Sequence, residues 1–319
     1  MQPPIPSKVM HRMTVISSNA FPAAFVALVI IASIAYPHFR TLDNLRNILV
    51  FASIPLIVAL GQTIVIIGRG IDLSVGSMMA LSGAVFSVLF MNQGVPMGLA
   101  FLICVVLGAA VGGSFNGFII TKLRVYMLIV TLGSFAIFRS QANVVLHGVT
   151  ITIYSDTLEW LVHGEIGPLP VVLSLAAVLC AIVWVVLRAT TFGRMLYAVG
   201  SNPTAARLAG IPVDRVLIIA YGLCAALAAI AGVLAVGQLG SAQPTIGVGT
   251  ELLSISAVIL GGTRLSGGWG GAGGTLIGVL FLGTLTNVLV LTGASSYWQG
   301  TMSGLVLVVA VALDRTRRD

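Results

Sequence analysis

Few residues of this chain have types and spacing that could support chemistry, and the most suggestive group is rich in glycine. The run Gly268-Trp-Gly270-Gly-Ala-Gly273 has the G-x-G-x-x-G spacing of a dinucleotide-binding turn. That turn requires a preceding strand and an acidic residue about 20 positions later. Here the next acidic residue is Asp314, and apolar runs flank the glycines on both sides. We therefore interpret the run as a tight turn between two helices.

Other motifs of enzymes and metal sites are absent from the sequence. No G-x-x-x-x-G-K-[ST] run is present with which the chain could bind and hydrolyse ATP. The histidines show no H-E-x-x-H pattern, and no serine lies in a G-x-S-x-G motif. Cys104, Cys180 and Cys224 lie in apolar runs without metal-ligand spacing. The sequence predicts no catalytic residue, metal site or cofactor, and an ATP-driven step would require a separate protein.

The composition places the chain in a lipid bilayer. Of its 319 residues, 58% are hydrophobic and 8% are charged, and the mean hydropathy is +1.08. A soluble domain carries about 25% charged residues, so this chain has too few charges to cover a surface in water. The net charge of +7 then concerns orientation in the membrane and not nucleic acid. We expect the chain to contact membrane lipid and to bind no nucleic acid.

Ten apolar stretches predict an all-α polytopic membrane protein with about ten transmembrane helices. The eighth and tenth are short, and the ten lie near 20–37, 48–67, 74–91, 95–120, 125–141, 169–187, 216–237, 251–262, 272–292 and 299–313. Cytoplasmic loops retain Lys and Arg. With both termini cytoplasmic, only Arg40, Arg46 and Arg139 fall on the outer side. We expect a cytoplasmic segment 1–19, one membrane domain 20–313 and a cytoplasmic tail 314–319.

Several polar residues remain inside the predicted spans. Gln62 and Thr63 lie in the second span, Asn116 in the fourth and Asn287 in the ninth. Polar side chains in hydrocarbon either line a pathway or bridge neighbouring helices, and both interpretations stay open. No ionisable residue lies near the middle of a predicted span. That absence counts against a proton- or sodium-coupled transporter, which requires such groups at depth.

Two connections on the predicted cytoplasmic side carry further candidates. In the segment 68–77, Asp72 or Ser74 could cap the third helix, or the segment could form a gate or partner contact with Arg69. The longest connection, 188–215, contains a stretch at 204–208 that can form a helix and Gly210, which would end it. This connection is either a solvated connector or a docking surface for a soluble partner.

Four motifs occur in order and resemble one family. They are GIDLSVGS at 70–77, AVGSNPTAARLAGI at 198–211, SAQPTIGVGTELLSISAVILGGTRLSGGWGG at 241–271 and GTLIGVLFLG at 274–283. They resemble the membrane-spanning permease subunits of ribose-type bacterial ABC importers. The resemblance implies an inner-membrane protein, a second permease chain in a homodimer or heterodimer, a cytoplasmic ATP-binding subunit and a periplasmic sugar-binding protein. Residues 156, 159, 165 and 243–251 could then form the docking surface for the binding protein. The alternative for the three acidic residues is that they are simply solvated.

The resemblance also implies which residues couple the chain to an ATPase. The family's coupling loop corresponds to Gly200, Asn202, Ala205, Ala206 and Gly210, while Thr204 replaces the Glu of many importer permeases. The implied function is translocation of a monosaccharide by alternating access, and the chain is not itself an enzyme. The alternatives are a branched-chain amino acid ABC permease and a stand-alone secondary transporter.

Overall fold

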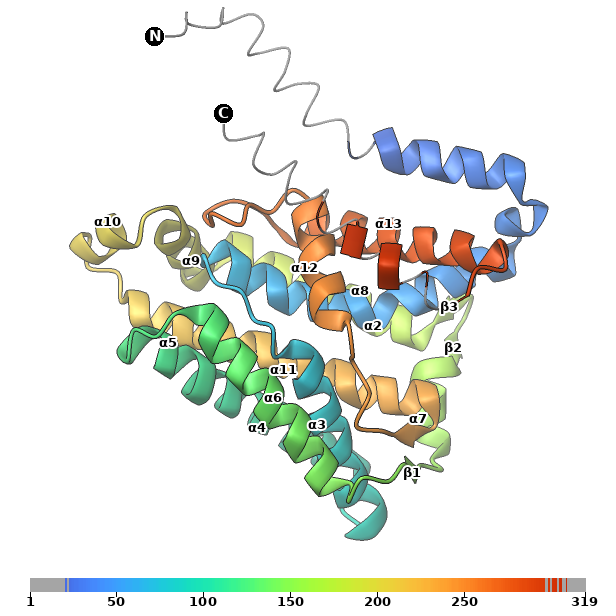
Figure 1. Cartoon of the computed structure of the whole chain (residues 1–319), viewed down its shortest axis with the longest axis horizontal. Helices are drawn as coiled ribbons and strands as arrows, with labels where there is room; N and C mark the ends of the chain where they lie inside the picture. Colours follow the sequence, from blue (N-terminus) through green and yellow to red (C-terminus); the bar gives the residue numbers. More distant parts are fainter. Residues whose placement is uncertain are drawn as a thin grey trace, which may run out of the picture.

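The computed structural model describes residues 21, 23–295, 298, 300–302, 304, 305 and 308, and helices dominate it (Figure 1). Seven helical stretches in this part are long and apolar enough to cross a membrane. These are α2 (Leu42–Ile67), α3 (Val75–Ser87) with η2 (Val88–Asn92), α4 (Met97–Val111) with η3 (Gly112–Gly117) and α5 (Phe118–Lys122), α6 (Met127–Val145), α8 (Val171–Ala189), α11 (Val213–Leu239) and α13 (Ala272–Leu291).

The polytopic helical class predicted from the composition is confirmed, and the count of ten spans stays a prediction. The first and eighth apolar stretches form shorter helices, Ala23–Ala35 and α12 (Thr250–Leu260). Most of the tenth stretch, 299–313, lies outside the described residues, as do the terminal segments 1–19 and 314–319. The domain boundaries and the cytoplasmic placement of both termini therefore also stay predictions.

The helices α2 and α11 form the centre of the bundle, and small residues let their neighbours approach closely. Gly61 of α2 lies against the backbone of Cys224 in α11, where an added Cβ would be 3.0 Å from Cys224 Cα. Gly108 and Gly112 likewise face Ala229 and Ala225 of α11. Gly-x-x-x-Gly spacing places both glycines on one helix face. Small residues at these positions therefore allow the close packing of the helices.

Two helices, α3 and α12, begin inside the molecule instead of at its ends (Figure 1). After α2, the non-helical segment 68–74 runs back beside that helix, so that Gln62 Nε2 donates to the backbone oxygen of Asp72 at 2.8 Å. The segment 243–249 runs inward to α12 from the other end. Gly76 and Gly247 contact each other through their backbones. The N-termini of α3 and α12 therefore meet in the interior.

Short elements mark the two ends of the bundle. At one end, which we call the α10 end, α9 (Thr191–Ser201) and α10 (Pro203–Leu208) connect α8 to α11. At the other, the α7 end, lie α7 (Asp156–His163) and two pairs of antiparallel strands. The strands are β1 (Ile151–Thr152) with β4 (Ser241–Ala242) and β2 (Glu165–Ile166) with β3 (Leu169–Pro170). The sequence did not lead us to expect α9 or these strands.

The charges of the described residues separate between these ends as the positive-inside pattern predicts. Eight of the eleven basic residues in this part belong to connections and helix ends at the α10 end: Arg69, Lys122, Arg124, Arg188, Arg194, Arg207, Arg215 and Arg264. Acidic residues of α7 and β2 lie at the α7 end. This separation supports placing the α10 end in the cytoplasm.

Candidate functional site

The connection between α8 and α11 is a helical elbow, which we define as α9 and α10 together. Asn202 begins α10 as its N-cap, because its Oδ1 accepts the backbone N–H groups of Thr204 and Ala205, each at 3.0 Å. Pro203 occupies the first helical position, where its missing N–H costs nothing. Gly210 ends the turn with φ of +80°. The short helix and its glycine stop are thus confirmed.

The elbow presents one face outward and buries the other. Thr204, Ala205 and Leu208 are exposed, and the side chain of Leu208 is 86% exposed. Ala206 is buried, and Gly200 has no room for a Cβ because the carbonyl of Ile67 lies against it. Of the five residues predicted to couple to an ATPase, Asn202, Ala205 and Gly210 lie at the surface, while Gly200 and Ala206 pack beneath it.

The outward face contains a residue that sequence reasoning missed. Leu208 follows Ala205 by three positions, a spacing that places both on one face of a helix. The available signal was a large apolar residue at that spacing within the short predicted helix, directly after Arg207. For α9, the signal was the repeated apolar spacing of its buried Leu196 and Val199, following the N-cap Thr190, whose Oγ1 accepts from Gly193 N at 3.2 Å.

The glycine-rich turn supports the elbow from behind. It follows helix α12 and not a strand, so the interpretation as a turn between helices is confirmed. Gly268 N donates to Ile67 O at 2.9 Å, which fixes the turn to the end of α2. Tyr197 Oη of α9 donates to Gly270 O at 2.8 Å, and burial raises the pKa of this phenol. A neutral donor therefore ties α9 to the turn.

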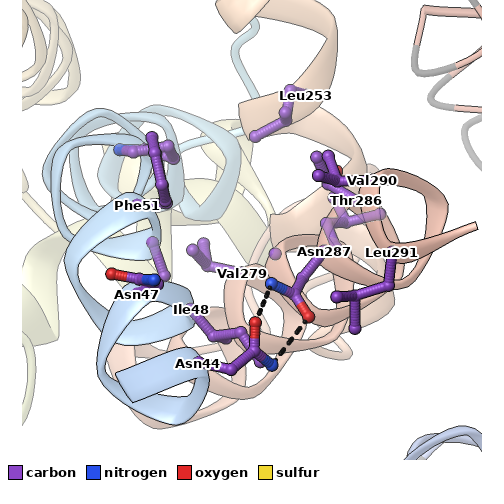
Figure 2. A pocket seen from close by; sticks show the side chains of 14 residues that line it. Asn44, Asn47, Ile48, Phe51, Leu253, Val279, Thr286, Asn287, Val290 and Leu291 are labelled. Atoms are coloured by element: carbon purple, nitrogen blue, oxygen red, sulfur yellow. Dashed lines mark hydrogen bonds between the residues drawn. The ribbon is translucent and has the colours of Figure 1, made fainter. Parts of the chain in front are cut away.

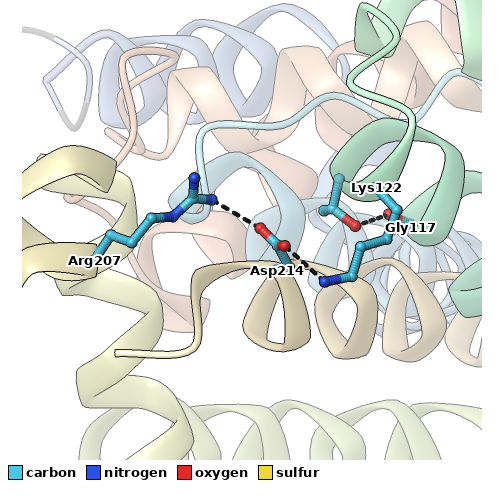
Figure 3. A network of polar contacts seen from close by, with 5 residues as sticks. Gly117, Lys122, Arg207 and Asp214 are labelled. Atoms are coloured by element: carbon cyan, nitrogen blue, oxygen red, sulfur yellow. Dashed lines mark hydrogen bonds and ion pairs between the residues drawn. The ribbon is translucent and has the colours of Figure 1, made fainter. Parts of the chain in front are cut away.

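One carboxylate ties the elbow to two other helices (Figure 3). Asp214, in the first turn of α11, accepts from Arg207 Nη2 of α10 at 2.8 Å and from Lys122 Nζ of α5 at 2.8 Å. The acid therefore joins the consecutive helices α10 and α11 to α5, which lies about 90 residues earlier in the chain. The side chains remain partly exposed, with 29% exposure for Asp214.

A second polar group is buried where the segment 68–74 meets α4 and α6. Asp72 Oδ1 accepts from Ser74 N at 2.8 Å and from Ser74 Oγ at 2.6 Å. Asn116 Nδ2 donates to Ser74 Oγ at 2.9 Å, and Ser134 Oγ donates to Asn116 Oδ1. Asn116 lies in η3, a π-helical turn of the kind that often marks functional positions. This set of four side chains is the Asp72 cluster.

The Asp72 cluster corrects the expected capping of the third helix. Ser74 holds the N-cap position of α3, but no side chain there accepts a helical N–H. Burial explains why Ser74 does not cap the helix. A buried carboxylate is costly without hydrogen-bond donors, and Asp72 accepts hydrogen bonds from Ser74 and Asn116. Arg69 is exposed at the α10 end and forms no ion pair with Asp72 within the described residues.

The four polar residues expected in the spans all have protein partners and do not form one group. Thr63 Oγ1 shares a hydrogen bond of 2.6 Å with Thr275 Oγ1. Asn287 and Asn44 exchange two hydrogen bonds, of 3.0 and 2.8 Å, at the edge of an apolar cavity of about 520 Å³ between α2 and α13 (Figure 2). Gln62 donates to the backbone oxygen of Asp72, and Asn116 donates to its carboxylate. Each of the four bridges helices or segments in this conformation.

Ionisable groups do lie at depth, contrary to the expectation from the sequence. Asp72 is fully buried, and Glu251 and Arg139 each carry a buried polar atom. The error arose because α3 and α12 start in the interior, so residues that flank short apolar runs lie far from the surface. Among the described residues, no group of three His, Cys, Asp or Glu side chains could hold a metal ion.

The comparisons with known proteins agree with this architecture. The family model described as branched-chain amino acid transport system / permease component matches residues 44–311. The chain is 41% identical to the ribose import permease protein RbsC of Escherichia coli strain K12 over 299 residues, 92% of each chain. It is 42% identical to RbsC of Bacillus subtilis, covering 91% of this chain and 90% of that one.

More distant relatives extend the comparison. The L-arabinose transport system permease protein AraH of Escherichia coli strain K12 is 34% identical, covering 92% of this chain and 89% of its own. No solved structure matches the chain. The chain belongs to the family of permease components of these transport systems, and it is a multi-pass protein of the cytoplasmic membrane.

Proposed function

We propose that this chain is the membrane-spanning permease subunit of an ATP-driven importer that moves a monosaccharide, a pentose or similar simple sugar, by alternating access. The observation that carries the proposal is the identity of about two fifths to ribose import permeases over nine tenths of the chain. The arabinose and allose permeases among the relatives extend the same chemistry. ATP binding and hydrolysis belong to a separate cytoplasmic subunit.

The elbow is the surface through which that subunit acts. Its outward face offers Leu208 as an apolar anchor, and buried apolar anchors carry most of the energy of an interface. Its inner face is fixed to α2 through Gly200 and to the glycine-rich turn through Tyr197. A push on α10 is therefore passed to the bundle as a rigid-body movement.

The remaining partners follow from the same scheme. A second permease chain, identical or related, completes the transport path, and a periplasmic sugar-binding protein delivers the substrate at the α7 end. The exposed acids Asp156 and Glu159 of α7 and Glu165 of β2 provide a charged surface there. Complementary charges guide such encounters and fix their orientation.

The proposal is tested by placing a charge on the anchor. Leu208→Glu should abolish co-purification of the ATPase subunit and reduce ATP-driven ribose uptake in proteoliposomes at least tenfold, because a desolvated carboxylate without a partner opposes docking. Leu123→Glu is the matched control, since Leu123 is an exposed leucine at the same end but outside the elbow. Docking and uptake that survive Leu208→Glu would contradict the coupling assignment.

The substrate class needs its own measurement because the family description names branched-chain amino acids. We expect uptake of labelled ribose, and not of labelled leucine, when the permease is reconstituted with its ATPase and binding protein. Leucine uptake would move the chain to the amino acid branch. Uptake without the ATPase would identify a stand-alone transporter.

A further inference from the structure

Two oppositely charged side chains lie close together in the interior without pairing with each other. Arg139 of α6 uses Nη1 to donate to the carbonyls of Ile246, at 2.7 Å, and Pro244, whereas its Nη2 is buried and makes no hydrogen bond within the described residues. Glu251 of α12 uses Oε1 to accept from Gly249 N at 3.1 Å, whereas its Oε2 is buried and also without a partner. The Glu251 charge acts on the Arg139 guanidinium.

The depth of these two groups places them near the middle of the membrane. Arg139 lies twelve residues after the start of α6 at Met127, about 18 Å along that helix from the α10 end. Glu251, in the first turn of α12, lies beside it because both side chains hold the segment 243–249. The hydrocarbon core is about 30 Å thick. Both groups are therefore near its midplane, where the N-termini of α3 and α12 meet.

A structural role accounts for only one of the two terminal polar atoms considered in each side chain. Arg139 Nη1 and Glu251 Oε1 hold the segment 243–249 in place through its backbone. The second atom of each group adds nothing to that role and carries the cost of burial without a hydrogen bond. Arg46 and Glu165 behave differently, because they pair directly with each other at the α7 end. Ionisable groups kept at depth in this way mark a substrate pathway.

The free atoms are one donor and one acceptor, which matches a sugar hydroxyl. A hydroxyl both donates and accepts, so one hydroxyl, or two neighbouring ones, can donate to Glu251 Oε2 and accept from Arg139 Nη2. We propose that these two atoms are the groups of this permease that hydrogen-bond a polyol as it crosses the middle of the membrane. The inference rests on the proposed function and adds the residues that contact the substrate.

Passage at this point requires the two interrupted helices to separate. Glu251 Oε2 lies against Gly76 of α3, and Gly247 lies against the same glycine. Neither glycine has a side chain, so α3 can move away from the segment 243–249 without a rotamer change at either residue. That movement uncovers Glu251 Oε2, and Arg139, which holds the segment 243–249 through Nη1, borders the same opening.

The test separates sugar passage from energy coupling. Glu251→Gln and Arg139→Gln are reconstituted with the ATPase and the binding protein, and ribose uptake and binding-protein-stimulated ATP hydrolysis are measured on the same vesicles. We expect uptake to fall at least about tenfold, since hydrogen bonds to charged groups are worth that much. Stimulated hydrolysis should stay within about twofold, so that the ribose delivered per ATP falls. The matched controls are Arg40→Gln and Asp43→Asn, which remove exposed charges just before and within the first turn of α2, away from the proposed binding surfaces, and should leave both readouts near wild type.

Each outcome decides the proposal. Unchanged uptake per ATP in both variants would overturn it, as would a parallel fall in uptake, hydrolysis and thermal unfolding midpoint, which indicates a structural role. If Arg139→Gln fails to assemble because it loses its bonds to Pro244 and Ile246, Glu251→Gln decides alone, since its amide oxygen still accepts from Gly249. A wild-type chain without ATP-driven ribose uptake would instead refute the proposed function.

Discussion

Asn44 and Asn287, 243 residues apart in the chain, bind each other through two reciprocal hydrogen bonds, and Asn44 Nδ2 also donates to Phe39 O at 3.2 Å. Each amide thus uses a donor and its oxygen within the protein, unlike a buried atom that has no partner. The same holds for Thr63, which shares its hydroxyl with Thr275 and with the carbonyl of Ala59. At the scale of residues, we therefore interpret these groups as links between helices, and Arg139 and Glu251 as the substrate contacts.

The asparagine pair gives a double-mutant prediction. Asn287→Leu alone should lower the free energy of unfolding by about 1 to 2 kcal/mol, because the Asn44 amide loses its partner. The double variant Asn44→Leu/Asn287→Leu should recover most of that loss, since neither amide is then left unpaired. Thermal unfolding in detergent measures the stability, and ribose uptake of the double variant should remain near wild type. Loss of uptake in a stable double variant would instead assign these amides to the pathway.

At the scale of elements, Asp214 joins α10, α11 and α5 through two ion pairs. Exposed pairs of this kind contribute at most about 1 kcal/mol to stability. Their main effect is therefore to hold the three helices in a fixed arrangement. The acid lies beside the hinge between the elbow and α11. It therefore fixes the angle at which a movement of α10 reaches α11 and α5.

This geometry predicts loss of coupling without loss of folding. Asp214→Asn should leave the unfolding midpoint nearly unchanged but lower the ribose transported per ATP hydrolysed several-fold, because α10 can then turn without moving its neighbours. Raising the ionic strength should weaken wild-type coupling toward that of the variant, since salt screens exposed pairs. Arg46→Gln, which breaks an ion pair at the α7 end, is the control. Full coupling in Asp214→Asn would show that backbone packing alone transmits the movement.

At the scale of the whole molecule, the ends differ in charge and in shape. The α10 end carries eight of the described basic residues and the elbow, and the α7 end carries acids and short strands. Cytoplasmic loops retain basic residues. This distribution supports a cytoplasmic elbow, on the side of the membrane where we propose that the separate ATP-binding subunit acts.

Cysteine labelling tests this orientation. In a Cys180→Ser background, which leaves only the buried Cys104 and Cys224, Arg207→Cys should react with an impermeant thiol reagent only after the cytoplasmic face is opened. Tyr154→Cys, at a residue 83% exposed near α7, should react from outside in intact cells. The reverse pattern would overturn the topology and with it the coupling assignment.

The sequence by itself determined the membrane class, the helical stretches that the structure describes and the short helix of the elbow. These features depend on local apolar length, on spacing and on turn residues, which are properties of contiguous segments. The four motifs also placed the chain in its family before any contact was known. Gly200 and Ala206 were found as parts of a motif, although the sequence did not reveal that both pack inward.

Only the tertiary structure decided where the chain interrupts its helices and which charges lie at depth. Asp72, Arg139 and Glu251 flank apolar runs and look like surface residues in the sequence. They are interior because the segments 68–74 and 243–249 fold back into the bundle, where α3 and α12 begin. Hydropathy reports how apolar a segment is along the chain, whereas depth depends on how distant segments pack, and that packing is fixed by contacts such as the one between Gly76 and Gly247.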